Sequence, residues 1–176
     1  MATARTSTAP APLDDVETRG AASGHQDLRL WLRMMAVHKL VTSEARRRLR
    51  ADFNMSLSRF DLMAQIDSAG GSLRMGEISN RLMVTTGNIT GLTDELEAEG
   101  LVERFADPRS RRALLVRLTP KGKKAFRAAA KANEDWIAEF FSVLPARDKK
   151  AMYEILGIQK AFLKTIVQPA GKAAIK

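Results

Sequence analysis

The sequence contains no cysteine and only two histidines, and aromatic residues make up 6% of its 176 positions. Without cysteine the chain can form neither a disulfide framework nor a thiolate metal site, and it has no thiol nucleophile. His38 is a poor metal ligand because no carboxylate cluster accompanies it. We therefore expect neither a metal site nor a cofactor.

Long apolar runs are also missing: no stretch of eighteen apolar residues occurs, so no membrane span is expected. The first thirteen residues lack the apolar region of a secretory signal. The sequence shows no nucleophile elbow, phosphate loop or paired-carboxylate motif. These absences predict a cytoplasmic protein that is not an enzyme.

Charge is abundant and unevenly distributed over the chain, whose formal net charge is +9. Residues 51–100 carry three basic and eight acidic side chains, a net −5. Residues 101–124 carry eight basic and two acidic side chains, a net +6. Such a concentration of positive charge in a short segment favours a polyanionic partner.

The first 26 residues are poor in apolar side chains and rich in Ala, Thr, Ser, Pro and Gly, which predicts a disordered tail. A long helix is expected over 27–51. It carries two adjacent apolar stripes, whereas a monomeric surface helix usually needs one, so burial on two sides is indicated. One stripe consists of Leu28, Trp31, Met35 and His38. The other consists of Leu30, Met34, Val37, Val41 and Ala45.

Beyond this helix, the residue pattern predicts a compact series of short elements. A helix over 57–68 ends at Ala69-Gly70-Gly71, and Leu73 with Arg74 can form a very short strand. The pattern then predicts a helix over 75–82, a turn at 83–85 and a helix that is capped by Thr85 and ends before Gly100. Two strands follow over 101–105 and 113–118, joined by a loop over 106–112. The last two helices run from Thr119-Pro120 to about Val143 and from Pro145 to Val167.

The order helix, turn, helix, strand, basic loop, strand describes a winged helix-turn-helix. The amino-terminal end of a recognition helix fits the major groove, and this end carries small polar groups. A basic loop can reach the neighbouring minor groove, where arginine is favoured. The expected DNA-binding residues are Arg81, Thr85, Thr86, Asn88, Thr90, Arg109, Arg111 and Arg112.

Five segments together resemble the MarR family of winged helix-turn-helix regulators. They are MGEISNRL at 75–82, TGNITGLTDELE at 86–97, GLVER at 100–104, DPRSRR at 107–112 and VRLTPKG at 116–122. The resemblance covers roughly residues 28–167. It implies a mainly α fold of about six helices with a small β-hairpin wing. It also implies a homodimer formed by the first helix and the last two.

This resemblance implies boundaries for the parts of the chain. The dimerisation helix covers 27–51, the DNA-binding domain 52–118 and the carboxy-terminal dimerisation helices 119–168. A flexible tail follows at 169–176. The family's wing arginine is best matched by Arg112, but the acidic residue that usually accompanies it falls at Ser110, so that Asp107 would have to substitute.

The recognition helix also departs from the family pattern. Gly91 and Glu95 occupy positions where relatives often have basic residues, and the outer half of the helix is acidic. We therefore expect the wing arginines to dominate DNA affinity. Further attraction would come from Arg59, Arg74, Arg81, Lys121, Lys123 and Lys124.

Two features have more than one interpretation. The run Arg46–Arg50 is either a solvated helix end, favoured by the helix dipole, or a phosphate-binding patch. A group of apolar residues either belongs to the core and the dimer interface or lines an effector pocket, in which His38 could meet a carboxylate. That group is Trp31, Met34, Met35, His38, Phe60 and Met63.

The leading functional hypothesis is a bacterial, nucleoid-associated repressor that an aromatic acid, or its acyl-CoA thioester, releases from a near-palindromic operator on double-stranded DNA. An architectural protein with little sequence preference is the alternative, and the acidic recognition helix argues against it. An enzyme, or a protein-interaction module that keeps the fold without binding DNA, is a third possibility.

Overall fold

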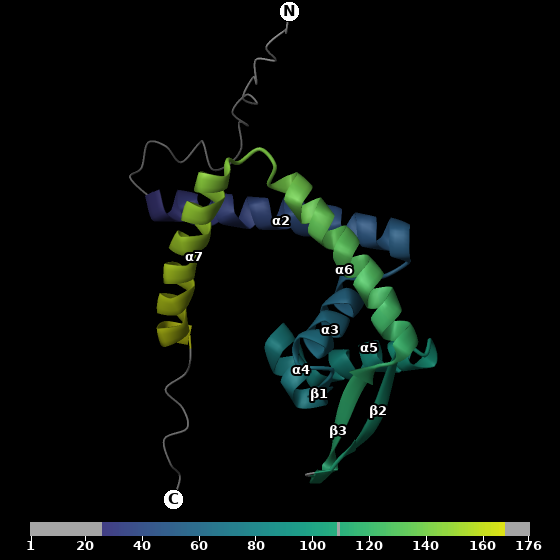
Figure 1. Ribbon diagram of the computed structural model, residues 1–176. Coiled ribbons are helices and arrows are strands. Elements are labelled where there is room, and N and C mark those ends of the chain that lie inside the picture. The colour runs from purple at the N-terminus through teal and green to yellow at the C-terminus, as the bar shows by residue number, and fades with distance from the viewer. Residues whose placement is uncertain (1–25, 109, 168–176) are drawn as a thin grey trace, which may run out of the picture. The chain divides into compact units, whose positions relative to one another are not determined.

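The computed structural model describes residues 26–108 and 110–167, and it divides the chain into two units, 1–57 and 58–176. The described residues form six helices and three strands, which confirms the prediction of a mainly α fold with a small wing (Figure 1). The predicted tails lie outside the described residues, except for Gln26. The proposed domain boundaries stay predictions.

The first unit contains the long helix α2, Gln26–Phe53. The helix ends where Asn54 adopts a left-handed conformation with φ 48°, and the Met55 N–H donates to the Leu49 carbonyl at 3.2 Å. Within α2 only Ala45 and Leu49 are buried. Most large apolar side chains of both predicted stripes are exposed in the single chain, among them Trp31 at 56%.

Part of the arginine run on α2 is engaged within the helix. Arg47 and Arg48 both donate to the Glu44 carboxylate, with Nε–O distances of 2.8 Å. These hydrogen bonds lower the pKa of Glu44 to about 2. Arg47 and Arg48 are thus partly neutralised, whereas Arg46 and Arg50 are exposed to solvent.

The second unit holds the remaining elements, and all of them except α7 contribute buried side chains to an apolar core. Their bounds are α3 Leu57–Ser68, β1 Ser72–Arg74, α4 Met75–Leu82, α5 Thr86–Ala98, β2 Val102–Asp107, β3 Ser110–Leu118, α6 Pro120–Phe140 and α7 Ala146–Val167. Leu62, Met63 and Ile66 of α3 are fully buried, as are Ile78 of α4 and Ile89 of α5. This core anchors the helices that would meet DNA.

The three strands form an antiparallel sheet in the order β1-β3-β2. Leu73 pairs with Val116, and Arg104 pairs with Val116 from the other side. The hairpin is longer than predicted, because β2 extends to Asp107 and β3 begins at Ser110. The expected loop over 106–112 was therefore too long, since Asp107 pairs with Ser110 across an irregularity in register.

Two tight connections join α5, β2 and α6. Gly100 has φ 69°, and the Leu101 N–H donates to the Leu96 carbonyl at 2.8 Å, which ends α5 as the sequence predicted. Thr119 caps α6 through its side chain, which accepts from the Gly122 N–H at 3.0 Å. A Cβ on Gly122 would lie 1.8 Å from the Leu101 carbonyl oxygen, so only glycine fits there.

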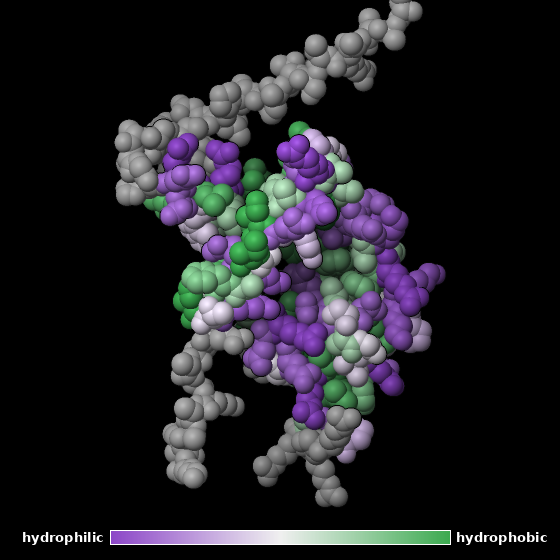
Figure 2. Space-filling view, turned by 60° about the vertical axis from the view of Figure 1, so that its left-hand side comes forward, coloured by the Kyte–Doolittle hydropathy of each residue, from purple (hydrophilic) through white to green (hydrophobic). Residues whose placement is uncertain are grey.

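Helices α6 and α7 differ in burial. Phe126 of α6 packs on Phe60 with ring centroids 5.5 Å apart, whereas every described side chain of α7 up to Ile166 is exposed. Hydrophobic side chains reach the surface on the face shown in Figure 2. Helix α6 ends at Phe140, three residues earlier than predicted, and α7 starts after Pro145. None of the described helices is long and apolar enough to span a bilayer.

Candidate nucleic-acid interface

The turn between α4 and α5 is fixed by backbone and side-chain hydrogen bonds. Met83 caps α4 in the left-handed region with φ 54°, and the Val84 N–H donates to the Ser79 carbonyl at 3.2 Å. The buried Ser79 hydroxyl in turn donates to the Val84 carbonyl at 2.6 Å. Thr85 caps α5, its side chain accepting from the Asn88 N–H at 3.4 Å, which confirms the predicted cap and turn.

Helix α5 separates a buried face from an exposed amino-terminal end. Ile89, Thr93 and Leu96 are fully buried, and the Thr93 hydroxyl donates to the Ile89 carbonyl at 2.7 Å. The burial of Thr93 was not predicted from the sequence, because the position of a threonine on an apolar stripe does not by itself indicate that the side chain is buried. The predicted contact residues Arg81, Thr85, Asn88 and Thr90 are all exposed. The side chain of Thr86 lies outside the described residues.

The acidic outer half of α5 is largely neutralised by arginines from other elements. Arg104 of β2 forms ion pairs with Asp94 at 2.6 Å and with Glu97 at 2.7 Å. Arg59 of α3 pairs with Glu99, just beyond the helix. Glu95 is exposed and has no ion pair among the described residues. The sequence showed these charges but not their partners.

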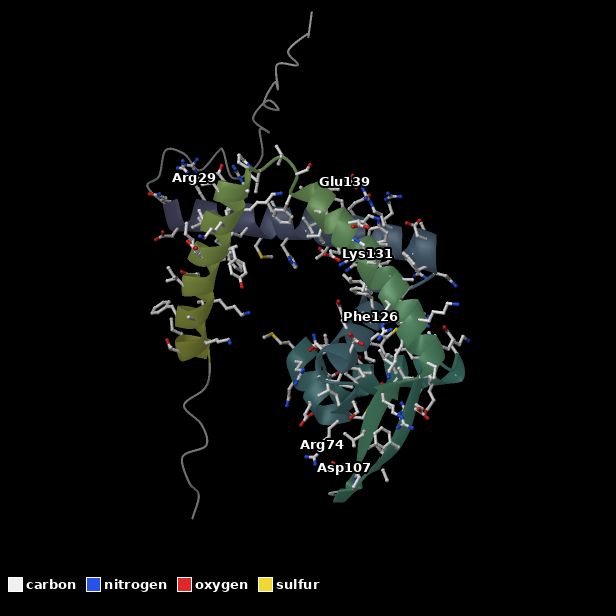
Figure 3. The ribbon with its side chains drawn as sticks, in the orientation of Figure 1. Arg29, Arg74, Asp107, Phe126, Lys131 and Glu139 are labelled. Atoms are coloured by element: carbon white, nitrogen blue, oxygen red, sulfur yellow. The ribbon has the colours of Figure 1, made fainter. Side chains whose placement is uncertain are left out.

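An ion pair with a buried carboxylate supports the wing. Arg74 of β1 donates to the Asp107 carboxylate at the end of β2, with an Nε–O distance of 2.6 Å. The Asp107 side chain is only 4% exposed, against 42% for Arg74, and Figure 3 labels both residues beside the hairpin. Asp107 thus binds Arg74, a partner that the sequence did not indicate.

The wing arginines themselves are only partly described. Arg109 lies outside the described residues, and Arg111 and Arg112 belong to β3, although their side chains are not described. Of the other predicted sources of positive charge, Arg59 binds Glu99, and Lys121 donates to the Glu99 carbonyl at 2.7 Å. Arg81, Lys123 and Lys124 are exposed.

Comparison with known proteins gives consistent results. The family model described as "MarR family" matches residues 55–114, which contain α4, α5 and most of the wing. An HTH-type transcriptional regulator of Bacillus subtilis (strain 168), YfiV, is 30% identical over 105 residues. That match covers 60% of this chain and 65% of YfiV.

Two solved structures extend the likeness to the fold. One is Sco3205, a MarR family transcriptional regulator from Streptomyces coelicolor in complex with DNA, with a TM-score of 0.69 at 23% identity. The match covers 80% of this chain and 87% of the Sco3205 chain. The other is the organohalide-sensing regulator RdhR-CbdbA1625 in its 2,4-dichlorophenol-bound form, with a TM-score of 0.72 at 14% identity. This match covers 86% of this chain and 89% of the RdhR-CbdbA1625 chain.

The chain is therefore similar to the MarR family in the sequence of its winged helix-turn-helix and in its fold. MarR family transcriptional regulators are DNA-binding proteins and not enzymes. The matches to YfiV and three other HTH-type regulators of Bacillus subtilis span from 49% to 65% of those proteins' length.

The MarR resemblance also raised the question of an effector pocket. Trp31, Met34, Met35 and His38 lie on α2 and are exposed in the single chain. Phe60 and Met63 lie on α3 and are buried. That these residues share one pocket stays a prediction.

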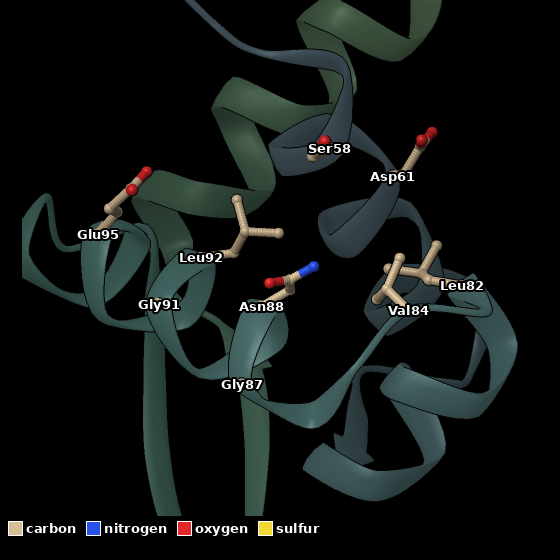
Figure 4. Close-up of a pocket in the computed structure, with 9 residues that line it drawn as sticks. All are labelled: Ser58, Asp61, Leu82, Val84, Gly87, Asn88, Gly91, Leu92 and Glu95. Carbon is tan, nitrogen blue, oxygen red and sulfur yellow. The ribbon is translucent and has the colours of Figure 1, made fainter.

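A different hollow lies within the winged helix-turn-helix, between α3 and α5. It has a volume of about 480 Å³, and Figure 4 shows the Asn88 amide pointing into it. Leu82, Val84 and Leu92 provide apolar walls, and Ser58, Asp61, Gly87, Gly91 and Glu95 complete the lining. Burial raises the pKa of the Asp61 carboxyl. Within the described residues, no cluster of three potential ligands could hold a metal ion.

Proposed function

We propose that this chain is a DNA-binding transcriptional regulator of the MarR type whose helix α5 reads base edges in the major groove. The observation that carries this proposal is the exposed polar end of α5, with Thr85, Asn88 and Thr90 held by a fixed turn. Asparagine can bond adenine in a bidentate manner, and threonine can contact phosphates or a thymine methyl. The hairpin β2–β3 then reaches the adjacent minor groove with Arg109, Arg111 and Arg112.

In this proposal the protein binds DNA as a homodimer. Two groups of exposed apolar side chains support it: Leu28, Trp31 and Leu40 on α2, and Tyr153, Ile158 and Phe162 on α7. Exposed apolar surface of this extent is unusual for a monomer and typical of an interface. A dimer sets its two recognition helices about 34 Å apart along the duplex, so its operator is a near-palindrome.

The regulator acts as a repressor at the nucleoid of a bacterial cell, and a small effector releases it. We propose an aromatic acid or its acyl-CoA thioester as that effector. The chlorophenol bound by the similarly folded RdhR-CbdbA1625 supports the aromatic class. The pocket we propose is lined by Trp31, Met34, Met35, His38, Phe60 and Met63, where aromatic and methionine side chains can adapt to an apolar ring.

The alternative is an architectural protein that binds any duplex. Such a protein depends on phosphate contacts, whereas the exposed Glu95 on α5 repels phosphates. A protein that reads a defined site tolerates such a charge more readily, because base contacts also contribute to its affinity. The structure therefore favours a sequence-reading regulator.

The experiment begins with a duplex selected from a random library by the wild-type protein. Two chains per duplex and a binding preference over scrambled DNA at fixed salt support the proposal, and equal affinity for both duplexes supports the architectural alternative. Arg109→Ala and Arg112→Ala test the wing: we expect each to weaken binding by roughly tenfold, as expected for lost charged contacts in a groove. Unchanged binding in both variants would show that these wing arginines do not contribute to DNA affinity.

The effector is tested on the same duplex. Benzoate-like acids and their acyl-CoA thioesters are titrated against the protein–DNA complex, and we expect release by at least one of them. His38→Ala removes the group that could meet the carboxylate of the effector, so it should abolish that release while leaving DNA affinity unchanged in the absence of effector. Release that persists in His38→Ala would contradict the proposed pocket.

A further inference from the structure

Helix α5 has a composition unsuited to approaching DNA by itself. Between Thr86 and Ala98 it carries three acidic side chains, Asp94, Glu95 and Glu97, and no lysine or arginine. The duplex presents one negative charge per ~1.7 Å of its axis, so uncompensated carboxylates on a reading helix are repelled. Compensation must therefore come from outside the helix.

Arg104 of β2 supplies it through several contacts at once. Its guanidinium pairs with Asp94 at 2.6 Å and with Glu97 at 2.7 Å, and it also donates to the Thr90 carbonyl at 3.3 Å. Its backbone N–H donates to the other oxygen of Glu97 at 2.9 Å. One residue thus bonds three positions of α5, which span two helical turns.

The exposure of these groups is unequal. The Arg104 side chain is 19% exposed, whereas the side chains of Asp94 and Glu97 are 59% and 38% exposed. The arginine is therefore held within the protein, and the carboxylates that it neutralises face solvent. Without Arg104, both negative charges would act on any polyanion that approaches α5.

We propose that Arg104 is a positioning residue that makes the acidic recognition helix compatible with DNA. It neutralises two of the three carboxylates of α5 and fixes the helix to the wing strand β2, without touching DNA itself. This inference rests on the proposed function, in which α5 enters the major groove. It assigns the control of DNA affinity to an ion-pair network inside the winged helix-turn-helix.

The test compares the full-length wild-type protein with Arg104→Gln on the library-selected duplex over a series of salt concentrations. The exposed carboxylates act within a Debye length, so salt should screen their effect. We expect Kd to rise roughly tenfold near ~0.05 M salt and only about twofold near ~0.5 M. Lys131→Gln is the matched control: it removes one positive charge from an exposed pair with Asp135 on α6 and should change Kd by less than about twofold.

A rescue variant distinguishes the effect of the uncompensated carboxylates from a structural defect. Arg104→Gln combined with Asp94→Asn and Glu97→Gln lacks both the guanidinium and the carboxylates, so we expect its Kd to return close to the wild-type value. A merely structural defect would not be repaired by removing more polar partners. A triple variant that binds as weakly as Arg104→Gln, or a salt-independent loss, would overturn the inference.

Two measurements keep the outcomes distinct. Thermal unfolding confirms that each variant is folded at the assay temperature, and Asn88→Ala reports independently on the entry of α5 into the groove. If Asn88→Ala leaves wild-type affinity unchanged, the proposed function fails. If Asn88→Ala weakens binding and Arg104→Gln does not, only the role of Arg104 fails.

Discussion

Arg74 and Asp107 form an ion pair across the central strand of the sheet. Arg74 lies on β1 and Asp107 at the end of β2, and β3 runs between these two strands. The carboxylate is nearly inaccessible to water, so its charge depends on partners within the protein. The pair thereby fixes the end of β2, next to the turn of the wing, to the strand that precedes the helix-turn-helix.

Arg74→Met should therefore destabilise the folded chain. Breaking a fully buried pair costs about 3–5 kcal/mol, and the partial exposure of Arg74 reduces this to about 1–2 kcal/mol. Urea unfolding measures the change in the free energy of unfolding. Lys131→Met, which breaks an exposed pair on α6, should cost less than about 0.5 kcal/mol. Equal losses in the two variants would contradict the structural role of Asp107.

Gly122 is required by the close approach of α6 to the connection before β2. In Gly122→Ala the new Cβ meets the Leu101 backbone rather than a movable side chain, so the helix must shift. We expect a loss of about 2–4 kcal/mol in the free energy of unfolding. Gly76→Ala on α4 is the matched control, because its Cβ meets nothing within 4 Å. A stable Gly122→Ala variant would show that α6 starts elsewhere.

Asp61 should make stability depend on pH. Burial raises the pKa of its carboxyl in the folded state, so the charged form is disfavoured there and stability is lost as pH rises through and above the unfolded-state value of 3.8. Asp61→Asn removes this penalty and should raise the Tm at pH 7 by about 2 °C. The difference from wild type should shrink towards pH 4. A lower Tm at pH 7 would contradict the prediction.

Glu95 is the acid of α5 without an ion pair among the described residues, and its removal should strengthen DNA binding. We expect Glu95→Gln to lower Kd roughly threefold at low salt, with the gain disappearing at high salt as screening increases. Glu134→Gln on the exposed side of α6 makes the same charge change away from the recognition helix. An equal gain in both variants would indicate that net charge alone is responsible.

Local features of the fold were predictable from the sequence, because their signals lie within a few residues. Thr85 and Thr119 are helix caps next to polar or proline positions, and Gly100 stands where a left-handed residue ends α5. The core positions Ile89 and Leu96 followed from helical spacing. The winged helix-turn-helix could therefore be predicted from short patterns in the right order.

The ion-pair network could not be predicted in the same way. Arg74 and Asp107 are 33 positions apart and meet only because β1 and β2 flank β3. The bonds of Arg104 to α5 likewise depend on the packing of a strand against a helix. The sequence indicated an acidic recognition helix with unmet charges, and the tertiary structure provides their partners.

The central claim is that the amino-terminal end of α5 reads DNA sequence, and Asn88→Ala tests it most directly. The measurement is the ratio of Kd values for a scrambled and the selected duplex at one salt concentration. The wild-type protein should prefer the selected duplex by a factor of roughly 10³ or more, and Asn88→Ala should reduce this ratio by about 10- to 100-fold, the discrimination of one bidentate base contact. An unchanged ratio would contradict the account.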